Sequence, residues 1–202
     1  MREMGLKALY PRPRTSIPQP GHRIYPYLLK DCLVERPNQV WATDITYIKL
    51  SQGFSYLVAM IDLYSRYILS WRLSNTLDTY FCLDMLEDGL KKGLPGIINT
   101  DQGCQFTSHS WLQAVQAAGI NVSMDGQGRW ADNIFIERFW RTLKYECVFL
   151  NQYQELGGLR HGLKDFIDFY NHKRLHQALG YKTPSEVYLG QKCSPIKTLR
   201  DH

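Results

Sequence analysis

The sequence predicts an α/β fold in which one mixed sheet is flanked by helices. Between residues 39 and 73, three segments rich in β-branched and aromatic residues follow one another with short turns, as in an antiparallel meander. Two shorter apolar segments, 96–100 and 120–123, then alternate with helical periodicity, which favours short parallel strands. A chain of 202 residues is long enough for one such domain with extensions at its ends.

The meander is expected to consist of strands at 39–50, 54–61 and 66–73. The first segment is apolar on both faces, which is typical of a central strand, yet Asp44 lies in its middle. A carboxylate in such a strand is costly unless it is paired, hydrogen-bonded or bound to a metal, so Asp44 needs a special explanation. Asp62, in contrast, is expected to cap the turn before the third strand.

A helix is predicted over 76–92, followed by the short strand 96–100. Asp101 follows this strand at once, and Gln102 and Gly103 bend the backbone, which leaves the carboxylate at the carboxyl end of the strand, where open α/β sheets place ligands. Ser108 or Thr107 can cap the next helix, 109–118. The glycine-rich loop 124–130 suits either a substrate flap or a plain connector.

The segment 132–144 combines an apolar and a charged stripe on one predicted helix. At about 100° per residue, one face collects Ile136, Phe139, Trp140, Leu143 and Cys147. Glu137, Arg141 and Lys144 fall together beside that face. The simpler alternative is that these charges form only a solvent-exposed ion pair, which would stabilise the helix by a few tenths of a kcal/mol. A second amphipathic helix is expected over 156–170, and Thr183 is expected to cap a short final helix in a capping box.

Proline and charge divide the chain into an arm at 1–36, a core at 37–190 and a tail at 191–202. Residues 1–38 hold six of the nine prolines, and seven Lys or Arg residues against three acidic ones. Proline removes a backbone donor, so this extended basic arm suits either a flexible linker or a segment lying along a phosphate backbone.

Composition excludes several classes of protein. Hydrophobic residues make up 44% of the chain, which excludes a disordered protein, and no apolar run approaches the roughly 20 residues of a membrane span. With no signal peptide, we expect a soluble, cytoplasmic protein. The five cysteines form no CxxC pair, so neither a disulfide framework nor a zinc site is expected. The net charge of +5 is weak evidence for nucleic acid.

Three carboxylates from distant segments, Asp44, Asp101 and Glu137, can converge on one point. Such oxygen clusters suit hard divalent cations, Mg²⁺ or Mn²⁺. Two ions about 4 Å apart can activate a water or a 3′-hydroxyl in phosphodiester chemistry.

Five motifs in order resemble the DDE transposase and retroviral integrase superfamily, nearest to bacterial insertion-sequence transposases with an integrase catalytic core. They cover most of 37–190 and read WATDITYI (41–48), IDLYSR (61–66), NTDQGCQFTS (99–108), ADNIFIERFWRTLKYE (131–146) and YNHKRLHQALGYKTPSEVY (170–188). The 35 residues between Asp101 and Glu137 match the D,D(35)E group.

The resemblance implies a ribonuclease-H-like fold in which Asp44, Asp101 and Glu137 are the catalytic residues and the ligands of Mg²⁺ or Mn²⁺, with two ions expected. It implies a metal-dependent polynucleotidyl transferase for DNA cleavage and strand transfer, working as a homo-oligomer on terminal inverted repeats and target DNA, at the nucleoid when bound. The expected DNA contacts are Arg138, Arg141, Lys144, His172, Lys173 and Arg174.

The start of the chain resembles only the end of the helix-turn-helix region of such transposases, so a truncated protein is expected. The missing region would then come from an upstream domain or a separate protein. Two alternatives remain open. The chain could be a catalytically silent DNA-binding remnant that modulates a full-length transposase, or a ribonuclease-H-type nuclease acting on RNA–DNA hybrids.

Overall fold

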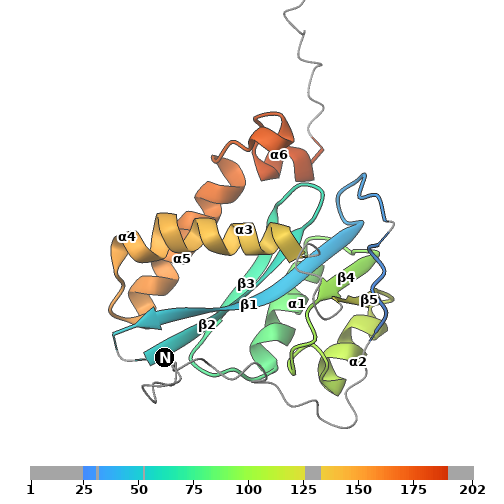
Figure 1. The fold of residues 1–202 in the computed structure, drawn as a ribbon, viewed down its shortest axis with the longest axis horizontal. Helices are drawn as coiled ribbons and strands as arrows, with labels where there is room; N and C mark the ends of the chain where they lie inside the picture. The colour runs from blue at the N-terminus through green and yellow to red at the C-terminus, as the bar shows by residue number, and fades with distance from the viewer. Residues whose placement is uncertain (1–24, 31, 52, 126–132, 191–202) are drawn as a thin grey trace, which may run out of the picture.

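A computed structural model describes residues 25–30, 32–51, 53–125 and 133–190, and it contains the predicted mixed sheet (Figure 1). The strands are β1 (Val40–Leu50), β2 (Gly53–Asp62), β3 (Ile68–Ser74), β4 (Ile97–Thr100) and β5 (Asn121–Met124). They lie in the order β3-β2-β1-β4-β5. The first three are antiparallel neighbours, whereas β4 pairs in parallel with both β1 and β5. This arrangement confirms the predicted fold class.

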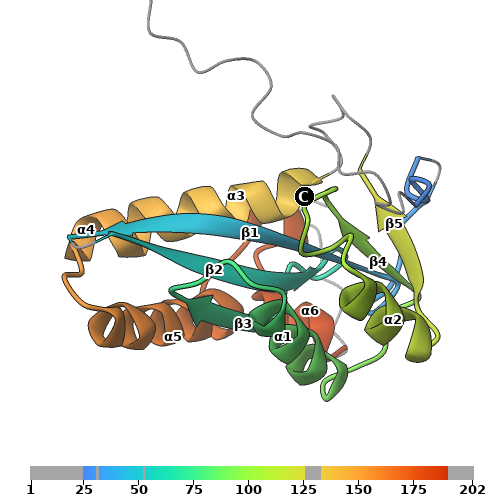
Figure 2. The same cartoon turned by 90° about the horizontal axis from the view of Figure 1, so that it is seen from below.

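Helices cover both faces of the sheet, and alternate residues of β1 point to different helices. Ala42 and Ile48 pack in the core beneath α3 (Ile134–Leu143) and α5 (Leu156–His172). Trp41 packs in the opposite core with α1 (Tyr80–Leu90) and α2 (His109–Ala117). Figure 2 shows α3 running alongside β1. The central strand is apolar on both faces because each face is covered, as expected.

The parallel pairing between β1 and β4 is short and places two of the predicted ligands side by side. Only Val40, Trp41 and Ala42 pair with β4, opposite Ile97, Ile98 and Asn99. Continuing the same offset by two residues sets Asp44 opposite Asp101, on strands roughly 4.8 Å apart. Asp44 shares the alternation of Ala42 and faces α3, where Trp140 donates to its carboxylate. Asp101 directly follows the last residue of β4.

The turn between β2 and β3 is built on Asp62, as predicted. Asp62 is fully buried, and its carboxylate accepts hydrogen bonds from the backbone N–H of Ser65 (2.8 Å), from the Ser65 hydroxyl (2.6 Å) and from the backbone N–H of Asn38 (2.8 Å). Arg66 has a positive φ of 65°, so β3 begins at Ile68 and not at residue 66 as expected.

Helix α1 begins at Tyr80, four residues later than the pattern predicted. The Asp78 carboxylate accepts the backbone N–H of Tyr80 at 3.0 Å, and Thr79 occupies the N-cap position. The apolar periodicity extends upstream of the true start because Leu77, in the preceding segment, continues the spacing. For α2 the expected cap is confirmed, since Ser108 Oγ accepts the backbone N–H of Trp111.

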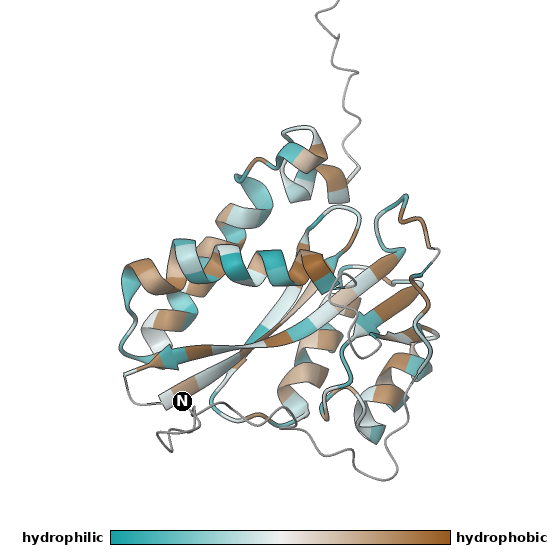
Figure 3. Ribbon diagram, viewed as in Figure 1, coloured by the Kyte–Doolittle hydropathy of each residue, from teal (hydrophilic) through white to brown (hydrophobic). Residues whose placement is uncertain are grey.

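All five residues of the predicted apolar stripe are buried, four on α3 and Cys147 on the segment that follows it. Hydrophobic and hydrophilic residues alternate along α3 (Figure 3). The helical run does not end at Lys144. The chain continues as a π-helix, η2 (Lys144–Val148), and then as α4 (Phe149–Asn151). The π-helix has a wider turn than an α-helix, a feature that sequence periodicity does not reveal.

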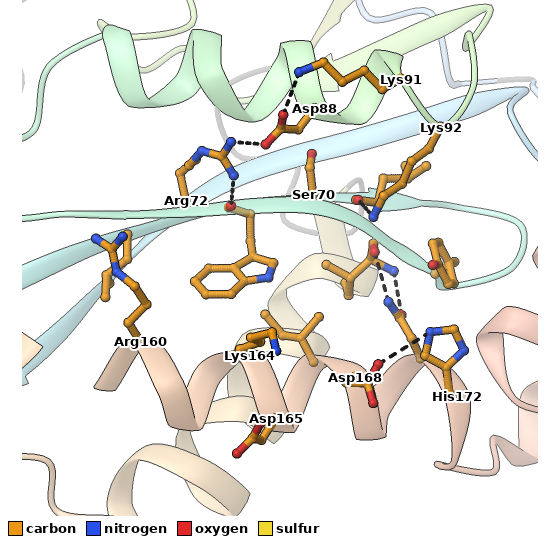
Figure 4. A pocket seen from close by; sticks show the side chains of 17 residues that line it. Ser70, Arg72, Asp88, Lys91, Lys92, Arg160, Lys164, Asp165, Asp168 and His172 are labelled. Carbon is orange, nitrogen blue, oxygen red and sulfur yellow. Dashed lines mark hydrogen bonds and ion pairs between the residues drawn. The ribbon is translucent and has the colours of Figure 1, made fainter. Parts of the chain in front are cut away.

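Strand β3 forms one edge of the sheet, and side chains from α5 and from the turn after α1 bond its outer backbone groups (Figure 4). The amide of Asn171 accepts the Ile68 N–H (2.9 Å) and donates to the Ile68 carbonyl (3.0 Å), as a neighbouring strand would. Lys92 Nζ donates to the Leu69 carbonyl. Such contacts blunt an edge that could otherwise pair with another chain.

Both ends of the described chain pack against the core. In the arm, the Leu28 N–H donates to Ser123 Oγ of β5 at 3.0 Å, and Figure 1 shows this segment beside β4 and β5. After α5 come η3 (Gln177–Leu179) and α6 (Pro184–Tyr188), where Thr183 and Glu186 form the predicted capping box. The predicted domain limits stay predictions, and residues 1–24, most of the loop 124–130 and the tail 191–202 lie outside the described residues.

None of the helices in the described ranges has the length and apolar character needed to cross a bilayer.

Replacing Asn171 with alanine should lower the free energy of unfolding by about 1–3 kcal/mol, because the Ile68 N–H and carbonyl would lose their buried partner. Urea unfolding measures the change. Asn75→Ala, at an exposed position after β3, is the matched control and should change stability little. Equal effects of the two substitutions would contradict the edge-clamping role of Asn171.

Candidate active site

Asp44 lies in β1 beneath the helix that carries Glu137. The indole Nε1–H of Trp140 in α3 donates to Asp44 Oδ2 at 2.9 Å. Trp140 itself is buried, at 6% exposure, so this carboxylate is the partner that its N–H requires. The bond joins the central strand to the helix and orients one oxygen of Asp44.

Asp101 follows β4 directly and remains accessible to solvent. Its Oδ1 accepts the backbone N–H of Gly103 at 2.9 Å. A Cβ added at Gly103 would lie 2.9 Å from the same oxygen, so glycine permits this close approach. Burial of the carboxyl group by surrounding protein atoms raises the pKa of Asp101, and the Gly103 hydrogen bond opposes that shift.

Glu137 lies in the first turn of α3 and is exposed. Its charge nevertheless reaches Asp44. Burial raises the pKa of Asp44 to about 6, the Trp140 hydrogen bond opposes the shift, and the negative charges of Asp101 and then Glu137 raise it further. Asp101 and Glu137 are therefore each close enough to Asp44 for their charges to act on it.

The donor set fits a divalent cation in its chemistry, but the side chains do not form a closed ligand cage. Carboxylate oxygens are the ligands that Mg²⁺ prefers, and a cation would relieve the repulsion around Asp44. Within the described ranges, however, no three His, Cys, Asp or Glu side chains stand close enough together to hold a metal ion. Binding would require the carboxylates to turn toward one point.

A polar network supports the strand ends beside Asp101. The Asn99 amide donates to Asp125 Oδ1 at 2.7 Å, and Ser123 Oγ donates to Asn99 Oδ1 at 2.8 Å. The Gln102 amide donates to the Asp125 carbonyl at 2.8 Å. These bonds tie β4 to β5 and hold the bend at residues 101–103. Sequence reasoning missed this network, since its members come from separate segments.

The predicted DNA-contacting cations divide into two groups. Arg138, Arg141 and Lys144 lie on α3 and η2, downstream of Glu137. Arg138 and Arg141 are exposed, with the Arg141 guanidinium 6.0 Å from the centre of the Tyr145 ring, and Lys144 is half-buried. Arg138 and Arg141 share α3 with Glu137, and Lys144 is the first residue of η2, which directly continues it.

The second group, at the end of α5, has carboxylate partners that the sequence did not suggest. Arg174 forms a two-pronged ion pair with Glu146 of η2. His172 Nε2 lies 3.7 Å from Asp168 Oδ1, and Figure 4 shows the two side chains facing each other. Lys173 is exposed. The pairing of His172 with Asp168 could be predicted from their i,i+4 spacing. The pairing of Arg174 with Glu146, which is 28 residues away, could not. A role in DNA binding stays a prediction for all three.

Arg66 is a further residue near the site that sequence reasoning did not select. Its guanidinium stacks over the ring of Phe135 at 3.3 Å from the ring centre, in the first turn of α3. Burial lowers the pKa of Arg66 to about 10. The contact ties the turn after β2 to the start of the helix that carries Glu137.

Comparison with known families gives two matches, both described as "Integrase core domain", over residues 34–129 and 118–184. Among curated proteins, the transposase for insertion sequence element IS629 of Shigella sonnei is 31% identical over 157 residues, covering 77% of this chain and 53% of that protein. The transposase for IS904 of Lactococcus lactis is 34% identical over 154 residues, covering 74% and 61%. The chain thus spans little more than half the length of these relatives.

Solved structures show the same fold at low identity. A chain of the simian T-cell lymphotropic virus intasome, in complex with PP2A regulatory subunit B56 gamma, matches with a TM-score of 0.68 at 20% identity and covers 88% of this chain and 63% of that one. The HTLV-2 integrase catalytic core domain in complex with magnesium matches with a TM-score of 0.61 at 20% identity, covering 76% and 97%.

Replacing Asp44 with asparagine should stabilise the metal-free protein at neutral pH. Because the folded-state pKa is raised, the carboxyl group favours folding less as pH rises from about 4 through about 6. Asp44→Asn should therefore raise the free energy of unfolding at pH 7.5 by on the order of 1–3 kcal/mol, with no difference below pH 4.

Urea unfolding at several pH values, in EDTA, measures this effect. Asp84→Asn, at an exposed position on α1, is the matched control and should show no such pH-dependent gain. Equal stabilities of wild type and Asp44→Asn at every pH would show that the charge of Asp44 carries no folding cost.

Proposed function

Because the chain belongs to the integrase core family of the DDE transposase and retroviral integrase superfamily, we propose that it is the catalytic core of a transposase that cleaves and joins DNA strands. The observation that carries this proposal is the geometry of Asp44: it is hydrogen-bonded to Trp140 of α3, the helix that bears Glu137, and it lies on β1 beside β4, the strand that Asp101 follows. The negative charges of Asp101 and Glu137 both raise the pKa of Asp44. Carboxylates from β1, from the end of β4 and from α3 form a donor set suited to divalent cations and phosphodiesters.

Asp44, Asp101 and Glu137 would hold Mg²⁺ or Mn²⁺, and we propose two ions. When bound, such ions lower the pKa of an attacking water or 3′-hydroxyl and stabilise the leaving oxygen of the phosphodiester. The protein positions the ligands: the Trp140 N–H orients Asp44, and the Gly103 N–H orients Asp101. A backbone hydrogen bond from Ile45 also stabilises the ionised Asp44 carboxylate.

The cations downstream of Glu137 are proposed to hold DNA. Arg138, Arg141 and Lys144 follow the glutamate along one helix, where they can neutralise phosphates next to the reacting bond. His172, Lys173 and Arg174 are weaker candidates, since Asp168 and Glu146 already engage two of them. The proposed substrates are terminal inverted repeats and target DNA, with a homo-oligomer joining two ends and an upstream helix-turn-helix protein or domain as a further partner.

A catalytically silent DNA-binding remnant is the alternative that one observation favours. Among the described residues, no three His, Cys, Asp or Glu side chains lie close enough together to hold a metal ion. A silent core would have the same arrangement. A titration of Mg²⁺ or Mn²⁺ followed by calorimetry separates the two, since the silent form would release or absorb no heat of binding.

Asp44→Asn, Asp101→Asn and Glu137→Gln should each abolish Mn²⁺-dependent nicking and strand transfer on DNA ends, because each removes one charged ligand. Gel analysis of end-labelled DNA measures both products, and circular dichroism checks that the fold survives. Glu87→Gln, exposed on α1, is the matched control and should keep full activity.

Retained activity in any of the three variants would remove that residue from the proposed ligand set. Comparing an RNA–DNA hybrid with duplex DNA tests the ribonuclease-H-type alternative: preferential cleavage of the hybrid would overturn the proposal of strand transfer.

Lys144→Gln should weaken DNA binding and reduce the slope of log affinity against log salt concentration by about 1, because one phosphate contact is lost. Fluorescence anisotropy over a salt series measures the slope. Lys164→Gln, on the exposed side of α5, is the control and should leave the slope unchanged. An unchanged slope for Lys144→Gln would show that this lysine makes no phosphate contact.

A further inference from the structure

A groove of about 750 Å³ lies between the end of β1, the start of β2 and the helical segment formed by η2 and α4. Its volume falls within the roughly 300–1,000 Å³ of pockets that hold small ligands. It borders the second half of β1, where β4 no longer pairs with the strand. No role for it follows from the three carboxylates alone.

The groove has an apolar floor and an aromatic rim. Ile48 and Val148 are buried at its base. At the rim, three aromatic rings are more than half exposed: Tyr47 at 56%, Phe54 at 58% and Phe149 at 57%. Aromatic side chains usually bury most of their surface, so three exposed rings around one hollow indicate a ligand that covers them.

The charge of the groove selects the kind of ligand. Two lysines, Lys49 and Lys144, line it, and the residues that line it include neither Asp nor Glu. A purely apolar partner would gain nothing from two unneutralised ammonium groups. A ligand that combines negative charge with flat aromatic rings would use both features, and unpaired nucleotides have this chemistry.

The position of the groove connects it with the carboxylates. Lys144 lines the groove and also follows Glu137 by seven residues on the same helix, a distance of roughly 10 Å along the helix axis. A DNA strand passing the carboxylates can therefore reach the groove without leaving the protein surface.

We propose that this hollow, the base groove, binds unpaired nucleotides of a DNA strand next to the carboxylates. The rings of Phe54 and Phe149 stack on bases, and Lys49 and Lys144 contact the flanking phosphates. The inference rests on the proposed action on DNA and adds to it a preference for strands that are partly unpaired.

The test compares binding of blunt duplex DNA with binding of the same duplex carrying a short single-stranded oligothymidine tail. Fluorescence anisotropy is measured with the wild-type chain in EDTA, so that cleavage does not contribute. We expect the tail to tighten binding by about fivefold or more, as stacking of even one base provides. Phe54→Ala and Phe149→Ala should remove this gain and leave blunt-duplex binding within about twofold of wild type.

Two further variants sharpen the comparison. Phe149→Trp keeps a ring at the rim and should keep the gain. Tyr80→Ala removes a ring that is 77% exposed on α1, away from the base groove, and should also keep it. Circular dichroism checks that each variant is folded.

Three results would overturn the inference: no gain from the tail in the wild type, an equal loss for blunt and tailed DNA in Phe149→Ala, or a loss of self-association with unchanged DNA binding. The last would identify the groove as a contact between copies of the chain. Because the measurement needs no catalysis, a tail preference in a protein that neither nicks nor joins DNA would refute the proposed function alone.

Discussion

The short parallel pairing between β1 and β4 is the constraint on which the site depends. It joins only three residue pairs, and beyond them the β4 side of β1 is unpaired at Asp44, while the other side still pairs with β2. A longer parallel pairing would place β4 against Asp44 as well. The network of Asn99, Ser123 and Asp125 strengthens this weak junction from the far side of β4. The register of β4 against β1 thus sets where Asp101 lies relative to Asp44.

Asp44 shows how the fold tolerates a charge in its central strand. Burial and two neighbouring carboxylates make the ionised form costly, and a single indole N–H offsets part of this cost. A neutral acceptor such as asparagine at position 44 could keep the Trp140 contact without the cost of a charge. The chain retains the aspartate where it is energetically unfavourable, which is characteristic of positions that serve chemistry.

Much of this arrangement was readable from the sequence because it follows from local rules. The five-residue stripe of α3, the Asp62 turn and the Thr183 capping box depend on neighbours a few positions apart, and the structure has all of them. The contact of Trp140 with Asp44 joins residues 96 positions apart, and Arg174 meets Glu146 across 28. Periodicity carries no information on such pairs, although a buried indole should prompt a search for its acceptor.

The π-helix that follows α3 has a consequence for how this protein can change over time. Its wide turn holds one residue more than an α-helical turn, so everything after it is rotated by about 100° compared with a continuous α-helix. Loss of a single codon within 144–148 would undo that rotation and swing Phe149 to another side of the segment. The number of residues in this stretch therefore sets the direction of Phe149, whatever side chains the stretch carries.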